Sequence, residues 1–305
     1  MTPAMIPFEA ETHLNWRALT DALLDGHTRP RAEIGDTFLY RGEDTMLTRS
    51  AWIDGLGSAV KTANIMPGNP ARGEPMIHGA VNLYDDVTGQ LAAIVDFHLV
   101  TKWKTAGDSV LGARLLARPD SKVILIVGAG TVGRNLRDAY GTMFPDARFL
   151  IWNRSPEGAA RFADECDKTE TVTSLEDGVS QADIITSATM TTDPLIKGDW
   201  LQPGQHLDLI GAYRPDMREA DDTALTRARL FMDSRDTVLN HIGEFKDPLA
   251  RGVITRDDIV GDLYDQKDGV FTRQTDDITL YKNGGGAHLD LMTSRYILDT
   301  WRAAT

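Results

Sequence analysis

VILIVGAGTVG, residues 123–133, is the stretch that decides the fold of this chain. Its first half, Val123–Val127, is wholly apolar, which is typical of a parallel strand buried on both faces. Its second half reads GxGxxG and leads into Arg134–Tyr140, which can continue as a helix. A second apolar run, Ala147–Trp152, follows. Because GxGxxG carries meaning only between a strand and a helix, this order predicts a dinucleotide-binding unit.

Each glycine of the motif has a separate physical task. Gly128 permits a tight turn, Gly130 lets the backbone approach a pyrophosphate, and Gly133 lets the helix pack closely on the strand. The first helical residues, Thr131 and Val132, would turn free N–H groups and the positive helix end toward the phosphates. A glycine-rich turn can also be purely structural, but the flanking strands and helix favour cofactor contacts for all five residues.

The end of the second strand selects the dinucleotide. An NAD site usually has Asp or Glu here, bonded to the ribose hydroxyls, whereas this chain has Asn153, Arg154 and Ser155. A guanidinium matches phosphate geometry, so Arg154 can pair with a 2′-phosphate, and Ser155 can add a hydroxyl. Ser155 can equally be an N-cap before Pro156. We therefore predict that NADP(H) is preferred, with NAD(H) as the alternative.

Strands and helices continue to alternate after Ser155, as in a doubly wound α/β domain. The expected elements are helices at Pro156–Cys166 and Ser174–Gln181, strands at Thr169–Thr173, Ala182–Thr189, His206–Ala212, Leu230–Asp233 and Asp277–Lys282, short helices in Gly243–Asp268, and a terminal helix at Ala287–Arg302. Four residues at or just after the ends of these strands complete the predicted cofactor contacts: Thr189, Tyr213, Asn283 and Gly284.

The first hundred residues follow a different pattern. An amphipathic helix is expected at Phe8–Gly26, and a second helix at Thr105–Ala117. Between them lie closely spaced strands without helices, which indicate an antiparallel sheet. The predicted strands are Thr37–Arg41, Thr45–Ile53, Ala59–Ile65, Met76–Tyr84 and Gln90–Phe97.

Charge and cysteine content exclude several classes of protein. The net charge of −13 and the pI near 4.9 argue against nucleic acid and anionic membranes as partners. Cys166 is the only cysteine, no secretory signal opens the sequence, and no apolar run is long enough to span a membrane. We therefore expect a cytoplasmic protein. The seven histidines show no metal-binding spacing, so no metal site is predicted.

Taken together, several motifs resemble the ornithine cyclodeaminase/mu-crystallin family over nearly the whole chain. They are Val60-Lys61-Thr62 before Pro67-Gly68-Asn69-Pro70, Lys104-Thr105 before Leu115-Leu116-Ala117-Arg118, Val127–Gly133, Ile151–Ser155, Gly211–Glu219, Asp233-Ser234, and Tyr281 through Ala287. The resemblance implies a homodimer. It also implies an α+β substrate and dimerisation domain built on the antiparallel sheet, joined to a Rossmann domain. The domains are then residues 1–118, the dinucleotide-binding residues 119–285, and a helix at 286–305 that packs back on the first domain.

The family acts on amino acids or imines beside a carboxylate, and its mu-crystallin branch, which this chain resembles most, reduces ketimines with NADPH. Substrate contacts carry over to Lys61 and Arg31. Two departures from the family pattern matter, one at Lys104 and Asp108 and the other at Tyr213. Lys104 stands where Arg opens a helix, and Asp108 one turn later is its expected ion-pair partner or a contact for a substrate ammonium. Tyr213 replaces the Asp of cyclodeaminases, so ornithine cyclisation is not favoured.

We therefore predict hydride transfer from the cofactor to a C=N carbon that carries a carboxylate, as in pyrroline-2-carboxylate or piperideine-2-carboxylate. Lys61, which interrupts an apolar strand, is the predicted catalytic proton donor. Lys61 and Lys104 would hold the carboxylate, and His78 could face the same site. Two alternatives stay open. One is an acyclic imino-acid reductase or amino-acid dehydrogenase, and the other is a non-catalytic NADPH-binding or ligand-binding protein.

Overall fold

A computed structural model describes residues 2–305. The chain divides into two compact units. Unit 1 comprises Met1–Lys104 and Gly286–Thr305, and unit 2 comprises Thr105–Gly285. One helix, α2 (Phe97–Leu116), contains the boundary between them. The functional domain boundary predicted near residue 118 stays a prediction.

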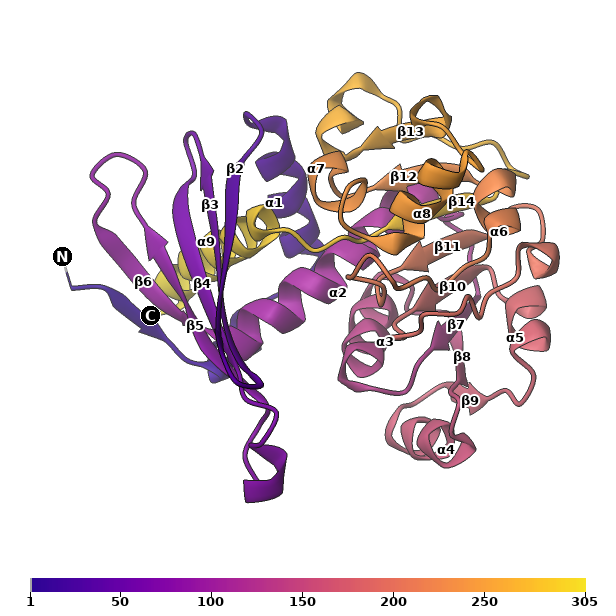
Figure 1. Ribbon diagram of the computed structural model, residues 1–305, viewed down its shortest axis with the longest axis horizontal. Helices are drawn as coiled ribbons and strands as arrows, with labels where there is room; N and C mark the ends of the chain where they lie inside the picture. The colour runs from indigo at the N-terminus through magenta and orange to yellow at the C-terminus, as the bar shows by residue number, and fades with distance from the viewer. Residues whose placement is uncertain (1) are drawn as a thin grey trace. The chain divides into compact units, whose positions relative to one another are not determined.

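Unit 2 is built on an eight-stranded sheet in which every strand pair is parallel. Its strands are β7 (Val123–Val127), β8 (Arg148–Trp152), β9 (Thr169–Thr171), β10 (Ile184–Ser187), β11 (His206–Leu209), β12 (Arg229–Met232), β13 (Ile259–Asp262) and β14 (Thr279–Lys282). The order β13-β12-β14-β11-β10-β7-β8-β9 reverses direction between β7 and β10 (Figure 1). The predicted doubly wound fold is confirmed, and the reversal marks where ligands bind in such sheets.

Helices separate the strands of unit 2 along the chain. They are α3 (Thr131–Met143), α4 (Pro156–Glu165), α5 (Leu175–Gln181), α6 (Asp222–Arg227), α7 (Arg235–Val238) and α8 (Gly243–Arg251), with shorter 3₁₀ turns η3 (Gly198–Trp200), η4 (Arg256–Asp258) and η5 (Leu263–Asp268). Three predictions were incomplete. The strand β13 was missed inside a polar segment, and β10 and β11 end earlier than expected. They end early because the following residues leave the sheet and bond to a buried carboxylate described below.

Unit 1 contains a six-stranded sheet in the order β1-β6-β5-β4-β3-β2. Its strands are β1 (Ala4–Ile6), β2 (Glu33–Arg41), β3 (Asp44–Ile53), β4 (Gly57–Ile65), β5 (Ile77–Tyr84) and β6 (Leu91–Asp96). Neighbours from β2 to β6 are antiparallel, as predicted, whereas the missed strand β1 pairs parallel to β6. The C-terminal helix α9 (Ala287–Ala304) packs against β3 and β4 (Figure 1).

Two helix predictions in unit 1 were wrong in their bounds. The first helix is interrupted: a 3₁₀ turn, η1 (Phe8–His13), precedes α1 (Trp16–Thr28), because Asn15 caps α1 by accepting a 3.1 Å bond from the N–H of Ala18. The helix α2 begins at Phe97 rather than at Thr105. Asp96 starts it by accepting a 2.8 Å bond from the N–H of Leu99. Lys104 therefore lies inside a helix and does not open one.

Among residues 2–305, no helix combines the length and the apolar character that a membrane crossing requires. Over the same residues, no group of three or more His, Cys, Asp or Glu side chains is arranged to hold a metal ion.

Candidate cofactor and substrate sites

The glycine turn after β7 has the geometry that its sequence predicts. Gly128 adopts a φ of +113°, which favours glycine. A Cβ on Gly133 would lie 2.2 Å from the carbonyl oxygen of Gly128, so only glycine lets α3 approach the turn this closely. A Cβ on Gly130 would meet nothing within 4 Å. The open space at Gly130 lies at the N-cap of α3, beside Thr131 and Val132, and therefore fits a phosphate group.

The residues after β8 join this turn. Asn153 accepts a 3.2 Å bond from the N–H of Ala129 through Oδ1, which ties the end of β8 to the glycine turn. Ser155 is the N-cap of α4 and accepts a 3.2 Å bond from the N–H of Gly158. Arg154 is exposed, and within residues 2–305 its side chain has no hydrogen bond or ion pair. It is therefore available for a ligand anion.

Sequence reasoning missed one acidic residue here. Glu157 accepts a 2.8 Å hydrogen bond from the hydroxyl of Ser155, and this bond lowers the pKa of the Glu157 carboxyl below its ordinary value. A carboxylate beside Ser155 opposes a second anion at the same hydroxyl. Its signal in the sequence, an acid two residues after the cap, is common to many helix starts and is not distinctive.

The loops after β10 and β11 are held by a single buried side chain. Glu219 accepts hydrogen bonds from both the N–H and the hydroxyl of Thr189, at 2.8 and 2.9 Å. Its other oxygen accepts bonds from the N–H groups of Gly211 and Ala212, at 2.6 and 3.2 Å. The next residue, Tyr213, is 57% exposed. The predicted residues Thr189 and Tyr213 thus stand on loops that one carboxylate joins.

Asn283 and Gly284 have structural partners. The side-chain amide of Asn283 donates to the carbonyl of Thr105 at 2.9 Å and to the hydroxyl of Ser109 at 3.0 Å. A Cβ on Gly284 would lie 2.7 Å from a methyl group of Val238. The Asn283 side chain therefore anchors the second half of α2, and its predicted cofactor contact stays a prediction.

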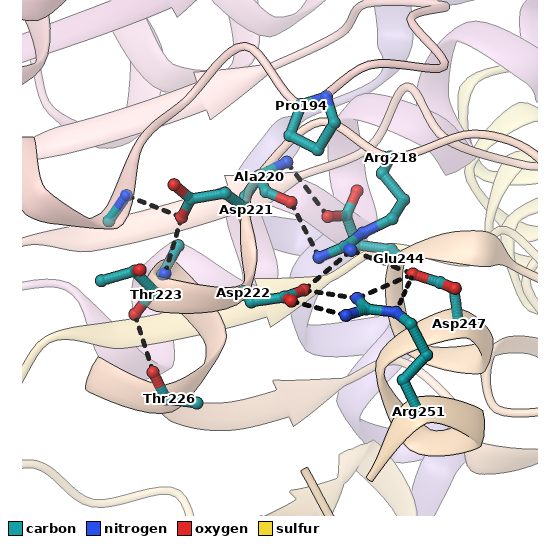
Figure 2. Close-up of polar contacts among 12 residues, drawn as sticks. Pro194, Arg218, Ala220, Asp221, Asp222, Thr223, Thr226, Glu244, Asp247 and Arg251 are labelled. Carbon is teal, nitrogen blue, oxygen red and sulfur yellow. Dashed lines mark hydrogen bonds and ion pairs between the residues drawn. The ribbon is translucent and has the colours of Figure 1, made fainter. Parts of the chain in front are cut away.

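A second buried acid, Glu244, supports Glu219 from α8. Its Oε2 accepts a 2.7 Å bond from the N–H of Glu219. Its Oε1 accepts a 3.1 Å bond from the N–H of Ala220, which Figure 2 shows. Nearby, Arg218 and Arg251 both pair with Asp222 and Asp247 in the ion cluster of Figure 2. Burial and the neighbouring charge of Glu219 raise the pKa of Glu244 to about 7.

This shift predicts a pH-dependent stability. The unfolded Glu244 carboxyl ionises near its ordinary value of 4.5, whereas the folded one keeps its proton until about 7. The stabilisation is therefore fully present below pH 4.5 and is lost as the pH rises through 7. The free energy of unfolding should fall by about 3 kcal/mol across this window. Denaturant titrations of the wild type and of Glu244→Gln measure it, and the variant should lose this slope.

Asp208 supplies the control for that experiment, because burial raises its pKa to about 6. Asp208→Asn should remove only the fall in the free energy of unfolding between its ordinary pKa of 3.8 and about 6. The fall near pH 7 should remain. A Glu244→Gln variant with the same pH profile as the wild type would contradict this assignment.

In unit 1, Lys61 is a buried cation with specific partners. It lies on β4, and its Nζ donates to Asp290 Oδ1 at 3.0 Å and to Thr101 Oγ1 at 2.8 Å. The same Nζ lies 4.6 Å from the ring centre of Phe97. Most lysines are solvated on the surface, but only 7% of Lys61 is exposed, so it is not one of them.

Lys104 lies beside the same carboxylate, with its Nζ 3.8 Å from Asp290 Oδ1. Phe97, Thr101 and Lys104 occupy one face of α2, as their spacing of four and three residues requires. Burial would raise the pKa of Asp290, but the charges of Lys104, Lys61 and Arg49 outweigh it and hold that pKa below its ordinary value. Asp290 is thus an ionised carboxylate inside the protein.

Arg49 extends the charged group across the sheet. In the strand register, Arg49 stands opposite Lys61 on one side and opposite Asp36 on the other. It pairs with Asp36 at 3.0 Å. Within unit 1, the cation cluster therefore consists of Lys61, Lys104 and Arg49, with Asp290 and Asp36 as its carboxylates. Buried cations grouped in this way attract anions.

The charges of this cluster also act on the imidazole of His288. Burial lowers its pKa well below the ordinary value, and the positive charges of His27, Lys104, Arg49 and Arg31 lower it further. His288 is therefore neutral. Arg31 is exposed in the segment between α1 and β2. The charge of the predicted residue Arg31 thus acts on His288, and its predicted substrate contact stays a prediction.

The structure does not bring His78 to Lys61. Lys61 stands opposite Val81 in the register of β4 and β5, so the side chain of His78 points to the other face of the sheet. The expectation that His78 faces the same site is wrong for this unit, because side chains three positions apart on a strand lie on opposite faces. His78 is exposed there.

Asp108, on α2 in unit 2, is fully buried and accepts a 2.7 Å hydrogen bond from the hydroxyl of Tyr281. Its predicted ion pair with Lys104 stays a prediction.

Comparison with known proteins places the chain among its relatives. The family model for the ornithine cyclodeaminase/mu-crystallin family matches residues 46–305. The chain is 51% identical over 296 residues to the Delta(1)-pyrroline-2-carboxylate reductase of Paracoccus denitrificans, which covers 95% of this chain and 94% of that protein. It is 32% identical over 242 residues to the ketimine reductase mu-crystallin of Mus musculus, covering 79% and 75% of the two chains.

A solved structure agrees with both units. The Thermococcus litoralis Delta(1)-pyrroline-2-carboxylate reductase, solved in complex with NADH and L-proline, matches with a TM-score of 0.88 and 25% identity, over 99% of this chain and 98% of that one. The chain belongs to the ornithine cyclodeaminase/mu-crystallin family.

Proposed function

We propose that this protein is an NAD(P)H-dependent reductase of imines that carry a carboxylate, with the cyclic ketimine Delta(1)-pyrroline-2-carboxylate as its first candidate substrate. The observation that carries the proposal is the buried cation cluster, in which Lys61 and Lys104 share the carboxylate of Asp290. The relative from Paracoccus denitrificans, named for this reaction, supports the substrate.

The glycine turn and the residues after β8 form the proposed cofactor site. The open space at Gly130 and the N-terminus of α3 would hold the pyrophosphate. When bound, NAD(P)H supplies the hydride that the imine carbon accepts. Arg154, exposed at the adenosine end, would bind the 2′-phosphate of NADPH. We therefore retain NADP(H) as the preferred cofactor, with Glu157 weakening that preference.

The residues of unit 1 would perform the remaining chemistry. Lys104 and Arg49 attract the substrate carboxylate. The ammonium of Lys61 donates a proton to the imine nitrogen as the neighbouring carbon is reduced, so that C=N becomes CH–NH. Asp290 and Thr101 orient that ammonium. A protonated imine is more electrophilic than a neutral one, which is why a donor is needed.

The outer strand of unit 1 supports a homodimer. Every residue of β2 is exposed, and its large apolar side chains include Phe38 at 49% and Tyr40 at 74%. Soluble monomers rarely present such an apolar edge strand. A second copy of the chain is the proposed occupant, in agreement with the dimeric assembly expected from the family resemblance.

A double substitution tests this assembly. Phe38→Asp combined with Tyr40→Asp should convert the dimer to a monomer, because carboxylates disfavour an apolar interface. Light scattering coupled to size-exclusion chromatography measures the mass. The control is Val87→Asp, which lies 89% exposed on the turn between β5 and β6. A wild-type protein that is monomeric at micromolar concentration would contradict the dimer.

A substrate panel tests the function itself. NADPH consumption should be fastest with cyclic ketimine carboxylates and slower with acyclic imines formed from a keto acid and an amine. The opposite order would favour the acyclic imino-acid reductase or amino-acid dehydrogenase. No turnover with either group would favour a non-catalytic binding protein. We keep a cytoplasmic location as part of the proposal.

A further inference from the structure

The loops after β10 and β11 part where the sheet ends. The last backbone bond between them joins the N–H of Ile210 to the carbonyl of Ser187 at 2.9 Å. Beyond it, the carboxylate of Glu219 replaces the backbone hydrogen bonds between the two strands. Its Oε1 accepts from the Ser187 hydroxyl at 2.6 Å and from the N–H and hydroxyl of Thr189. Its Oε2 accepts from the N–H groups of Gly211 and Ala212. One fully buried carboxylate thus fixes both loops.

The packing around Glu219 leaves the two loops little freedom. A Cβ on Gly211 would lie 2.0 Å from the carbonyl oxygen of Thr189 and 2.7 Å from Glu219 Oε1, so the loops touch directly. The backbone of Glu219 is fixed as well. Its N–H donates to Glu244 at 2.7 Å, and its carbonyl accepts from Leu195 and Ile196, both at 3.0 Å.

These fixed loops present large apolar side chains outward. Met190 is 74% exposed and Tyr213 is 57% exposed. In a sheet that reverses between β7 and β10, a dinucleotide lies across the reversal. The adenosine half takes the side of β8, where Arg154 stands, so the nicotinamide half lies toward β10 and β11. Exposed Met and Tyr side chains suit contact with a flat heteroaromatic ring.

We propose that Glu219 is a positioning residue for the nicotinamide half of the cofactor, holding the loops of Thr189–Met190 and Gly211–Tyr213 in the geometry that the ring requires. Glu244 keeps Glu219 in place. This inference rests on the proposed dinucleotide function. It assigns to Glu219 no contact with the substrate or with the reacting atoms.

Glu219→Gln is the sharpest test, because it preserves size and replaces one oxygen with an amide that faces backbone N–H donors. One loop then loses its acceptor. The affinity for NADPH should fall about 10- to 100-fold, whereas adenosine 2′,5′-bisphosphate, which lacks the nicotinamide, should bind as it does to the wild type. Calorimetry measures both ligands. The fluorescence change of NADPH on binding should shrink in parallel.

Asp222→Asn is the matched control, since Asp222 pairs with Arg218, the residue next to Glu219, but bonds to neither loop. It should lower the melting temperature without changing either affinity. If Glu219→Gln fails to fold, Ser187→Ala removes one hydroxyl donor to Glu219 without changing a predicted cofactor residue, and it should weaken NADPH alone. An equal loss for both ligands, or none for NADPH, would overturn the inference. A wild type that binds neither ligand would instead refute the proposed function.

Discussion

Lys61→Met is expected to lower kcat with a carboxylate-bearing imine by about 10²- to 10⁴-fold, the range typical of a lost general acid. The methionine has a similar length but can neither donate a proton nor attract a carboxylate. NADPH affinity should not change, because the proposed cofactor residues belong to unit 2. Stopped-flow kinetics and an NADPH titration of the same preparation measure the two quantities.

The buried partner of Lys61 makes a folding control necessary. Removing Lys61 leaves Asp290 with Lys104, whose Nζ is 3.8 Å away, and broken buried ion pairs are costly. Lys61→Met combined with Asp290→Asn restores the charge balance and should recover the melting temperature but not the activity. Wild-type activity in Lys61→Met would remove this lysine from the mechanism.

Arg154→Ala is expected to weaken NADPH binding about 10- to 100-fold while changing NADH binding little, because a charge-assisted pair with the 2′-phosphate would be lost. The side chain is exposed, so the fold should not be affected. Fluorescence titrations with both cofactors measure the preference.

Arg161→Ala is the matched control for Arg154→Ala. Arg161 is another exposed arginine, within α4, and its loss changes the net charge equally. It should leave both affinities unchanged. Comparable binding of NADPH and NADH by the wild type would refute the preference for the phosphorylated cofactor.

The cofactor-binding fold could be predicted from sequence because its signals are local. Val123–Val127 and the glycines that follow fix a strand, a turn and a helix start within a few residues, and the structure confirms the fold. Lys61 could be singled out for a related reason, since a charged residue inside an apolar strand is seldom a solvated surface residue. The start of α2 was placed too late because Asp96 both ends β6 and caps α2, so no loop separates the strand from the helix.

The partners of these residues could not be predicted in the same way. Asp290 stands 229 residues from Lys61 in the chain, and nothing local in the C-terminal helix distinguishes its carboxylate. Arg49 gives the same signal as Lys61, a charge within a predicted strand, and could have been found. His78 was misplaced because the face it occupies depends on the register of β4 and β5, which the sequence does not contain.

Glu219 is the residue whose contacts could least be predicted from the sequence. Its role follows from donors on two loops that meet only when the parallel sheet has formed. In the sequence Glu219 ends the motif Gly211–Glu219, but the motif does not show which groups its carboxylate contacts.

The most direct test of the central claim, that buried cations hold the carboxylate of an imine reduced by NAD(P)H, compares two cyclic imines that differ only in that carboxylate. Purified protein should consume NADPH with Delta(1)-pyrroline-2-carboxylate, form proline in equal amount, and show at least a 10²-fold lower kcat/KM with unsubstituted 1-pyrroline. Equal kcat/KM values for the two imines, or no NADPH consumption with either, would contradict the account.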